Sequence, residues 1–270
     1  EDFEVIVVDD GSTDDTEDVV KTHSDYRVRY ISLNSNKGAN AARNEGIKQS
    51  RGRYISFLDS DDEFTRNHIE NVLLALSNAN PEIKGVYTTQ ITMQNNERKY
   101  SNQATQILSD PNQVIEGYPA NGFSSFTFHE NIFDQIEWLD ENLKAFQDRE
   151  FLTRYLNRYT LSPINEELVI YHAHGDRIST DSARKISALE EMIRKHEEKV
   201  KSANNAFLHY SRAHLYAKNQ NMTVARKWFF EASKNKPASL KYHAHSIFSL
   251  FGYNEYKSIQ YLKKRMKTKI

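Results

Sequence analysis

The sequence contains no cysteine and no long hydrophobic run. Without cysteine the chain can form neither a disulfide nor a thiolate metal site, which fits a reducing compartment and predicts a cytoplasmic protein. No run approaches the ~20 apolar residues that a membrane-spanning helix needs, and no signal peptide is visible at the start. With 270 residues, 38% hydrophobic and 27% charged, the composition predicts a soluble globular protein with one large domain, or one domain and an appendage.

The charges are divided unequally along the chain. Residues 1–180 carry 17 Lys and Arg against 30 Asp and Glu, a net charge of −13, whereas residues 181–270 carry 19 against 7, a net charge of +12. This asymmetry predicts two units that meet near residue 180. The basic unit could face anionic lipid, nucleic acid or the acidic half of its own chain, but it holds no recognisable nucleic-acid-binding module, so no nucleic-acid partner is expected.

The two units also differ in their expected secondary structure. Strand-like and helical segments alternate up to about residue 172, which predicts an α/β fold, and Asn95-Asn96 between two strand-like runs predicts a hairpin turn. From residue 182 onward only helical periodicity is present. Within it, residues 208–237 resemble one tetratricopeptide-type helix pair, with a plain helical bundle as the alternative. The helical segments are expected near residues 183–203, 205–219, 222–235, 238–251 and 254–267.

Two short acidic clusters each follow a strand-like apolar run. They are VVDDGSTDD, residues 7–15, and FLDSDDEF, residues 57–64. Carboxylates at the ends of buried strands are costly unless a cation lies among them. A divalent metal that carries a phosphorylated ligand would neutralise them, and oxygen ligands suit Mg²⁺ or Mn²⁺. Asp62 also precedes a helical segment, which predicts that it caps this helix.

A third segment, NSNKGANAARNEGI at residues 34–47, lies between the two clusters. In this order and spacing the three segments resemble the nucleotide-sugar glycosyltransferases of family 2, whose pattern runs VVDDGSxDxT, NxGxxxARNxGI and GxYIxFLDxDD. The resemblance is close over residues 5–64 and continues less tightly to about residue 180. It implies the GT-A fold, a mixed sheet flanked by helices, for residues 1–180, followed by a basic all-α extension over residues 181–270. Family members usually have a strand and a helix before the first acidic cluster, so it also implies that these are missing here.

The resemblance assigns roles on the donor side of the site. Asp61 would bind a divalent metal, Mn²⁺ or Mg²⁺, that bridges the diphosphate, and Asp59 would contact the ribose or a metal-bound water. His174, after the last strand, would ligate the metal or touch the diphosphate. For Arg43, an ordinary ion pair with a carboxylate is the alternative to nucleotide binding. The other nucleotide contacts are expected from Asp10, Lys37, Arg43 and Asn44.

The resemblance also assigns roles on the acceptor side. The family has an acidic pair, usually Glu-Asp, at the start of a helix below the acceptor, and its second member is the general base. In WLDENLKAFQDREFLTRYL, residues 138–156, this position is Asp148, while Gln147 replaces the usual Glu; a capping role for Asp148 is the alternative. Acceptor contacts are expected from Gly122, Phe123 and Ser124, although core packing could also explain Phe123.

These assignments together imply an inverting glycosyltransferase with a single-displacement mechanism. The donor would be a nucleotide-diphosphate sugar, UDP-linked rather than GDP-linked, and the acceptor a saccharide or a lipid-linked saccharide. The basic segment 257–270 could hold the protein peripherally at an anionic membrane surface, and a solvated helix of a bundle is the alternative. A catalytically degenerate protein that binds sugars or partners is one alternative. A receiver-type signalling domain fits the acidic positions loosely, but it leaves NKGANAARNEGI unexplained.

Overall fold

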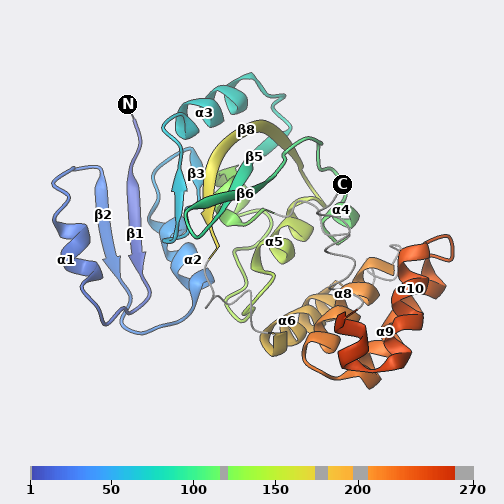
Figure 1. Cartoon of the computed structure of the whole chain (residues 1–270). Coiled ribbons are helices and arrows are strands. Elements are labelled where there is room, and N and C mark those ends of the chain that lie inside the picture. The colour runs from blue at the N-terminus through green and yellow to red at the C-terminus, as the bar shows by residue number, and fades with distance from the viewer. Residues whose placement is uncertain (1, 116–120, 174–181, 197–205, 259–270) are drawn as a thin grey trace. The chain divides into compact units, whose positions relative to one another are not determined.

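The computed structural model describes residues 2–115, 121–173, 182–196 and 206–258 (Figure 1). The chain forms two compact units. One contains Glu1–Val114 and Tyr118–Gly175, and the other contains Ile115–Gly117 and Asp176–Ile270. We call them the sheet unit and the helical unit.

The sheet unit begins with a two-stranded parallel sheet. Strand β1 (Val5–Asp9) pairs in parallel with β2 (Val28–Ser32), and helix α1 (Thr16–Lys21) connects the two strands. Helix α2 (Ala39–Gln49) follows and packs against β1. The first acidic cluster therefore stands at the carboxyl end of β1, where the chain leaves the sheet.

A six-stranded sheet forms the centre of this unit, with strand order β3-β7-β5-β8-β4 and with β6 paired to β5. The long, curved strands β5 and β8 run parallel to each other, and the other pairs are antiparallel (Figure 1). The sheet is therefore mixed, and helices flank it, which confirms the predicted fold class. The strands are β3 (Tyr54–Ser56), β4 (Asp62–Phe64), β5 (Ile83–Gln94), β6 (Glu97–Asn102), β7 (Phe126–His129) and β8 (Thr160–His172).

Apolar side chains cover both faces of the six-stranded sheet. Val86 of β5 packs with helix α3 (His68–Asn78), whereas the next residue, Tyr87, belongs to the cluster that contains Phe151 of helix α5 (Gln147–Tyr155). Successive residues of a strand point to opposite faces, so α3 and α5 lie on opposite sides of the sheet. The short helical elements of this unit are α4 (Pro111–Ile115), η1 (Phe123–Ser125) and η2 (Glu130–Ile132).

The predicted hairpin is confirmed. Asn95 and Asn96, between β5 and β6, have φ angles of 53° and 60°, as a type I′ turn requires. The prediction that Asp62 caps a helix is wrong. Asp62 begins strand β4 and pairs with Tyr171 of β8, and helix α3 starts only after Asn67. Pairing with a strand more than 100 residues further along the chain overrides the local cap signal.

The helical unit confirms the predicted all-α C-terminal region. Helices α8 and α9 pack around the buried Phe229, and the small side chains of Ala213, Ala217 and Ala225 allow the helices to approach closely. The predicted helix at 254–267 lies mostly outside the described residues. Among the residues that are described, no helix is both long and apolar enough to cross a bilayer. The elements are α6 (Ser182–Lys195), α8 (Ala206–Lys218), α9 (Met222–Asn235), α10 (Leu240–Phe248) and η4 (Ser249–Phe251).

Candidate active site

The turn that follows β3 carries the second acidic cluster. Asp61 is exposed and Asp59 partly exposed, whereas Asp62 is buried. The hydroxyl of Ser124 accepts a hydrogen bond from the Asp59 backbone N–H at 3.1 Å and donates one to Oδ2 of Asp62 at 2.6 Å. The His172 backbone N–H donates to the other oxygen of Asp62 at 3.4 Å. This network fixes the turn between two strands and leaves Asp59 and Asp61 on its outer side.

The carboxylates of this turn influence one another. Burial, together with the charges of Asp59 and Asp61, raises the pKa of Asp62 to about 6, although the hydrogen bond from Ser124 opposes the rise. The carboxyl groups of Asp59, Asp61 and Asp62 together create a negative potential at this turn. The turn is therefore an electrostatic site for a cation.

Arg43 of α2 connects this acidic turn to the beginning of α5. Its Nη2 donates to Oδ1 of Asp59 at 2.6 Å, and its Nη1 lies 3.3 Å from Oε1 of Gln147. The guanidinium group also stacks over the ring of Phe123, with Cζ 4.4 Å from the ring centroid. The guanidinium of Arg43 thus contacts Asp59, predicted on the donor side, Phe123, predicted on the acceptor side, and Gln147, the neighbour of the predicted base Asp148. The pair with a carboxylate, which the sequence left as an alternative for Arg43, is formed.

Asp148 lies in the first turn of α5. Phe146, just before the helix, has a left-handed φ of 56°, which turns the chain sharply into the helix. Burial raises the pKa of Asp148, against the opposing effect of the positive charges of Arg149 and Arg43. A partly exposed carboxylate with a raised pKa has the properties of a general base, because its pKa lies closer to neutral pH.

The first acidic cluster shapes the loop before α2. The Asp9 carboxylate accepts hydrogen bonds from the hydroxyl of Tyr30 and, at 2.7 Å, from the backbone N–H of Ser12, and these bonds lower the pKa of Asp9. The Asp10 oxygens accept the backbone N–H groups of Lys37 and Gly38 at 2.7 and 2.6 Å. Asp10 therefore holds the backbone of Lys37 and Gly38, while the contacts of Asp10 and Lys37 with a nucleotide stay a prediction.

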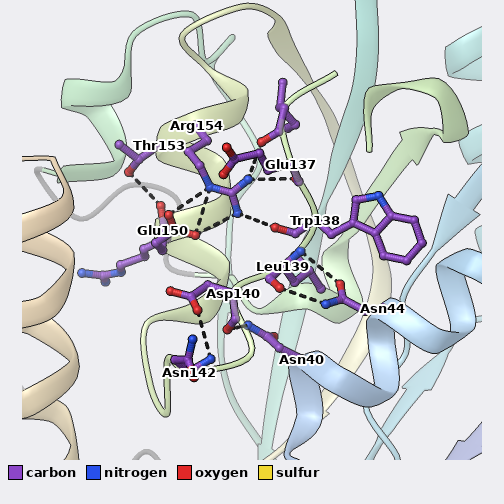
Figure 2. A network of polar contacts seen from close by, with 12 residues as sticks. Asn40, Asn44, Glu137, Trp138, Leu139, Asp140, Asn142, Glu150, Thr153 and Arg154 are labelled. Atoms are coloured by element: carbon purple, nitrogen blue, oxygen red, sulfur yellow. Dashed lines mark hydrogen bonds and ion pairs between the residues drawn. The ribbon is translucent and has the colours of Figure 1, made fainter. Parts of the chain in front are cut away.

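Asn44 contacts the protein backbone rather than facing an open site (Figure 2). It is buried, and its side-chain amide donates to the carbonyl of Leu139 at 2.9 Å and accepts the Leu139 N–H at 3.0 Å. Asn40, one helical turn earlier, donates to the carbonyl of Asp140 at 2.8 Å. Both asparagines anchor α2 to segment 139–140. We therefore leave Asn44 out of the nucleotide-binding group proposed below.

Arg154 of α5 holds the stretch just before segment 139–140, residues 136–138 (Figure 2). It forms a two-pronged pair with the buried Glu150, at 2.9 Å from Nε to Oε1 and 2.9 Å from Nη2 to Oε2. It also donates to the carbonyls of Ile136, Glu137 and Trp138. Arg154 was not among the residues predicted from the sequence, although the four-residue spacing of Glu150 and Arg154 is typical of a helical ion pair.

We expect Arg154→Ala to destabilise the sheet unit by about 3 kcal/mol, because it leaves the Glu150 carboxylate buried without its partner. Urea unfolding followed by circular dichroism measures this change. Arg158→Ala is the matched control: Arg158 is exposed and its guanidinium donates to one carbonyl, that of Gln135. Its loss should cost less than about 1 kcal/mol. Equal effects of the two substitutions would show that the Arg154 network does not stabilise the fold.

The predicted acceptor residues differ in exposure. Phe123 and Ser124 are buried, and Phe123 packs against Phe57 and Phe126 in the aromatic core. Gly122 is partly exposed, and a Cβ atom at this position would meet no other atom within 4 Å. Of the three, Gly122 is therefore the one that borders open space, while Ser124 supports the acidic turn from behind. His174 lies outside the described residues.

The acidic turn fits one common mode of metal binding. Among the described residues, no three acidic or histidine side chains come together as a ready-made cage. Mg²⁺ is, however, usually held by one or two carboxylates together with water and substrate phosphates. Asp61 and Asp59, on the outer side of the turn, have the oxygen ligands that this mode requires.

This fold and this site define a GT-A-type transferase, and comparisons with known proteins agree. The family described as Glycosyl transferase family 2 matches residues 1–136. An uncharacterized glycosyltransferase of Haemophilus influenzae is 30% identical over 247 residues, which cover 88% of this chain and 82% of that protein. The chain belongs to the family-2 glycosyltransferases, as the sequence predicted.

Two further comparisons give a sequence match over a short stretch and a match in fold. WfaP of Escherichia coli, a UDP-Glc:alpha-D-GlcNAc-diphosphoundecaprenol beta-1,3-glucosyltransferase, is 48% identical over 69 residues, which are 26% of this chain and 28% of WfaP. The crystal structure of S. aureus TarS 1-349 in complex with UDP-GlcNAc has a TM-score of 0.65 at 15% identity. That alignment covers 97% of this chain and 83% of the TarS chain, so the two share a fold.

Proposed function

We propose that this glycosyltransferase is an inverting, metal-assisted enzyme that moves a sugar from a UDP-sugar to a hydroxyl group of a saccharide or lipid-linked saccharide. The observation that carries the proposal is the bridge of Arg43 between Asp59 and Gln147, next to Asp148. It holds the cation-attracting turn and a carboxylate of raised pKa in one site. A transfer reaction needs both, because the leaving diphosphate must be stabilised while the acceptor loses a proton.

The reaction divides between the two sides of the site. A divalent metal, when bound by Asp61 and Asp59, would supply positive charge next to the diphosphate, and Arg43 would add its own. Asp148 would accept the proton of the acceptor hydroxyl. The acceptor oxygen would form a bond to C1 of the sugar as the bond from C1 to the diphosphate oxygen breaks, and the diphosphate would leave with the electron pair. One displacement inverts the configuration at C1.

The donor and acceptor classes rest on the relatives. WfaP is named for UDP-Glc and a diphosphoundecaprenol-linked acceptor, and the TarS neighbour was crystallised with UDP-GlcNAc. These names support a UDP-sugar for this protein too, and a lipid-linked acceptor would place it at the cytoplasmic face of a membrane. Asp10 and Lys37 would contact the nucleoside side, Gly122 would border the acceptor, and His174 would approach the diphosphate.

A non-catalytic sugar-binding protein is the second candidate, because Gln147 stands where the family usually has Glu. Nucleoside diphosphate release separates the two candidates. We expect release from UDP-glucose or UDP-N-acetylglucosamine, but not from GDP-mannose, in the presence of Mn²⁺; EDTA should abolish it and added Mn²⁺ should restore it. Metal-dependent UDP binding without any release, across donors and acceptors, would favour the binding protein instead.

A further inference from the structure

The helical unit exposes a group of large apolar side chains on its last described elements. Among the described residues of this unit, the exposed large hydrophobic side chains all lie on α9, α10 and η4, and their exposure ranges from 55% for Ile247 to 86% for Leu240. These three elements pack against one another. Exposed apolar residues gathered on neighbouring elements indicate an interaction site, whereas single exposed apolar residues do not. We call the group the apolar face. Its members are Phe230, Leu240, Ile247, Leu250 and Phe251.

The members of the apolar face come from α9, α10 and η4, and α9 packs against both of the other elements. Helix α10 buries Tyr242 and His245 and turns Leu240 and Ile247, seven residues apart, away from this core. Arg226 of α9 contacts η4, and Ala232 of α9 packs with Tyr242 near the start of α10. Phe230 therefore lies on the part of α9 between these two contacts.

The backbone at Leu250 and Phe251 is held in place although both side chains are exposed. Nε of Arg226 donates to the carbonyl of Ser249 at 2.7 Å, and Nη2 lies 3.4 Å from the carbonyl of Leu250. Gly252, with φ of 98°, then turns the chain back toward the buried Tyr256. The bonds from Arg226 and the turn at Gly252 thus hold the backbone that carries these two exposed side chains.

The charge around the apolar face is mainly positive: residues 226–257 include six basic residues and two acidic ones, Glu231 and Glu255. Between Glu231 and Glu255 the sequence has no acidic residue, but it has Lys234, Lys236 and Lys241. The segment 181–270 as a whole carries a net charge of +12, with 19 basic and 7 acidic residues. A second copy of this face would bring like charge against it, whereas an anionic lipid surface complements both its charge and its apolar centre.

We infer that the apolar face docks the protein on an anionic lipid bilayer, with Leu250 and Phe251 at the boundary between headgroups and acyl chains. Lys234 and Lys236 would lie near the lipid phosphates. This inference goes beyond the proposed function, since docking requires neither donor nor metal. A failure of docking would therefore leave the transfer reaction untouched, and the reverse also holds.

Co-sedimentation of the full-length protein with vesicles tests this inference. Vesicles of phosphatidylcholine with phosphatidylglycerol should bind the protein, and vesicles of phosphatidylcholine alone should not. The double variant Leu250→Ser/Phe251→Ser should weaken binding by at least ~10-fold, with the rest of the chain intact. Lys234→Gln/Lys236→Gln should weaken it by at least ~5-fold, and high salt should have the same effect.

A matched control removes exposed leucines elsewhere. Leu73→Ser/Leu74→Ser changes two exposed residues of α3 in the sheet unit, and vesicle binding should not change. Thermal unfolding of each variant shows whether it is folded. The inference is overturned if the folded protein does not bind anionic vesicles, or if the variants of the apolar face bind as well as the native protein. A switch from dimer to monomer in Leu250→Ser/Phe251→Ser without vesicle binding would overturn it in favour of self-association.

Discussion

Asp148→Asn should lower kcat for sugar transfer by about 10³-fold, within the range of 10²–10⁴ that general-base catalysis contributes. The amide keeps the shape of the side chain but cannot accept the acceptor proton. A carboxylate base works only when it is deprotonated, so native kcat should fall as pH drops through the pKa of Asp148. Because burial raises this pKa, the fall should occur above the range of an exposed aspartate, ~3.9.

The substitution should not destabilise the protein. A raised pKa means that the folded state disfavours the ionised carboxylate, so above this pKa the native Asp148 lowers stability relative to acidic pH. The neutral amide removes this cost, and the melting temperature at neutral pH should be equal or higher. Asp134→Asn, at an exposed position of the same unit, is the control and should keep native kcat. Near-native kcat in Asp148→Asn would exclude Asp148 as the base.

Asp61→Ala should remove most of the metal dependence of UDP binding. We expect Mn²⁺-dependent affinity to fall by at least ~100-fold, since the loss of a direct ligand should exceed the 10–100-fold cost of removing a residue that only orients a ligand. Titration calorimetry of UDP with and without Mn²⁺ measures this directly, and it does not depend on knowing the acceptor.

A nearby exposed acid, two residues along the chain, offers a matched control for this experiment. Glu63 is exposed and its Oε1 lies 2.7 Å from Nε2 of His172, on the β4 strand rather than on the turn. Glu63→Gln should leave Mn²⁺-dependent UDP binding within about twofold of native. If both variants bind UDP and Mn²⁺ as the native protein does, the acidic turn is not the metal site.

Local patterns were sufficient to predict most of the elements. Helix α9 begins and ends where the apolar periodicity predicted, and the paired asparagines at 95–96 form the expected turn. The acidic clusters were placed correctly at strand ends because β-forming runs and the charges that follow them are adjacent in sequence. The full length of β8 cannot be read from its own pattern, since its polar first half is held by pairing with β5.

The supporting contacts of the site could not be predicted, because they join residues far apart in the chain. The amide of Asn44 reaches the backbone 95 residues later, and the hydroxyl of Ser124 reaches Asp62 across 62 residues. The family resemblance assigned Asn44 to the nucleotide, but a motif does not distinguish a residue that contacts the nucleotide from one that anchors α2. Only the packed structure shows which partner each polar side chain has.

The central claim is that one side of this site binds the nucleotide while Asp148, on the other, performs the proton transfer. The most direct measurement compares UDP binding and UDP release from the donor in a single preparation of Asp148→Asn with Mn²⁺. We expect native affinity for UDP together with loss of release. Release at the native rate, or the loss of both binding and release in a folded protein, would contradict it.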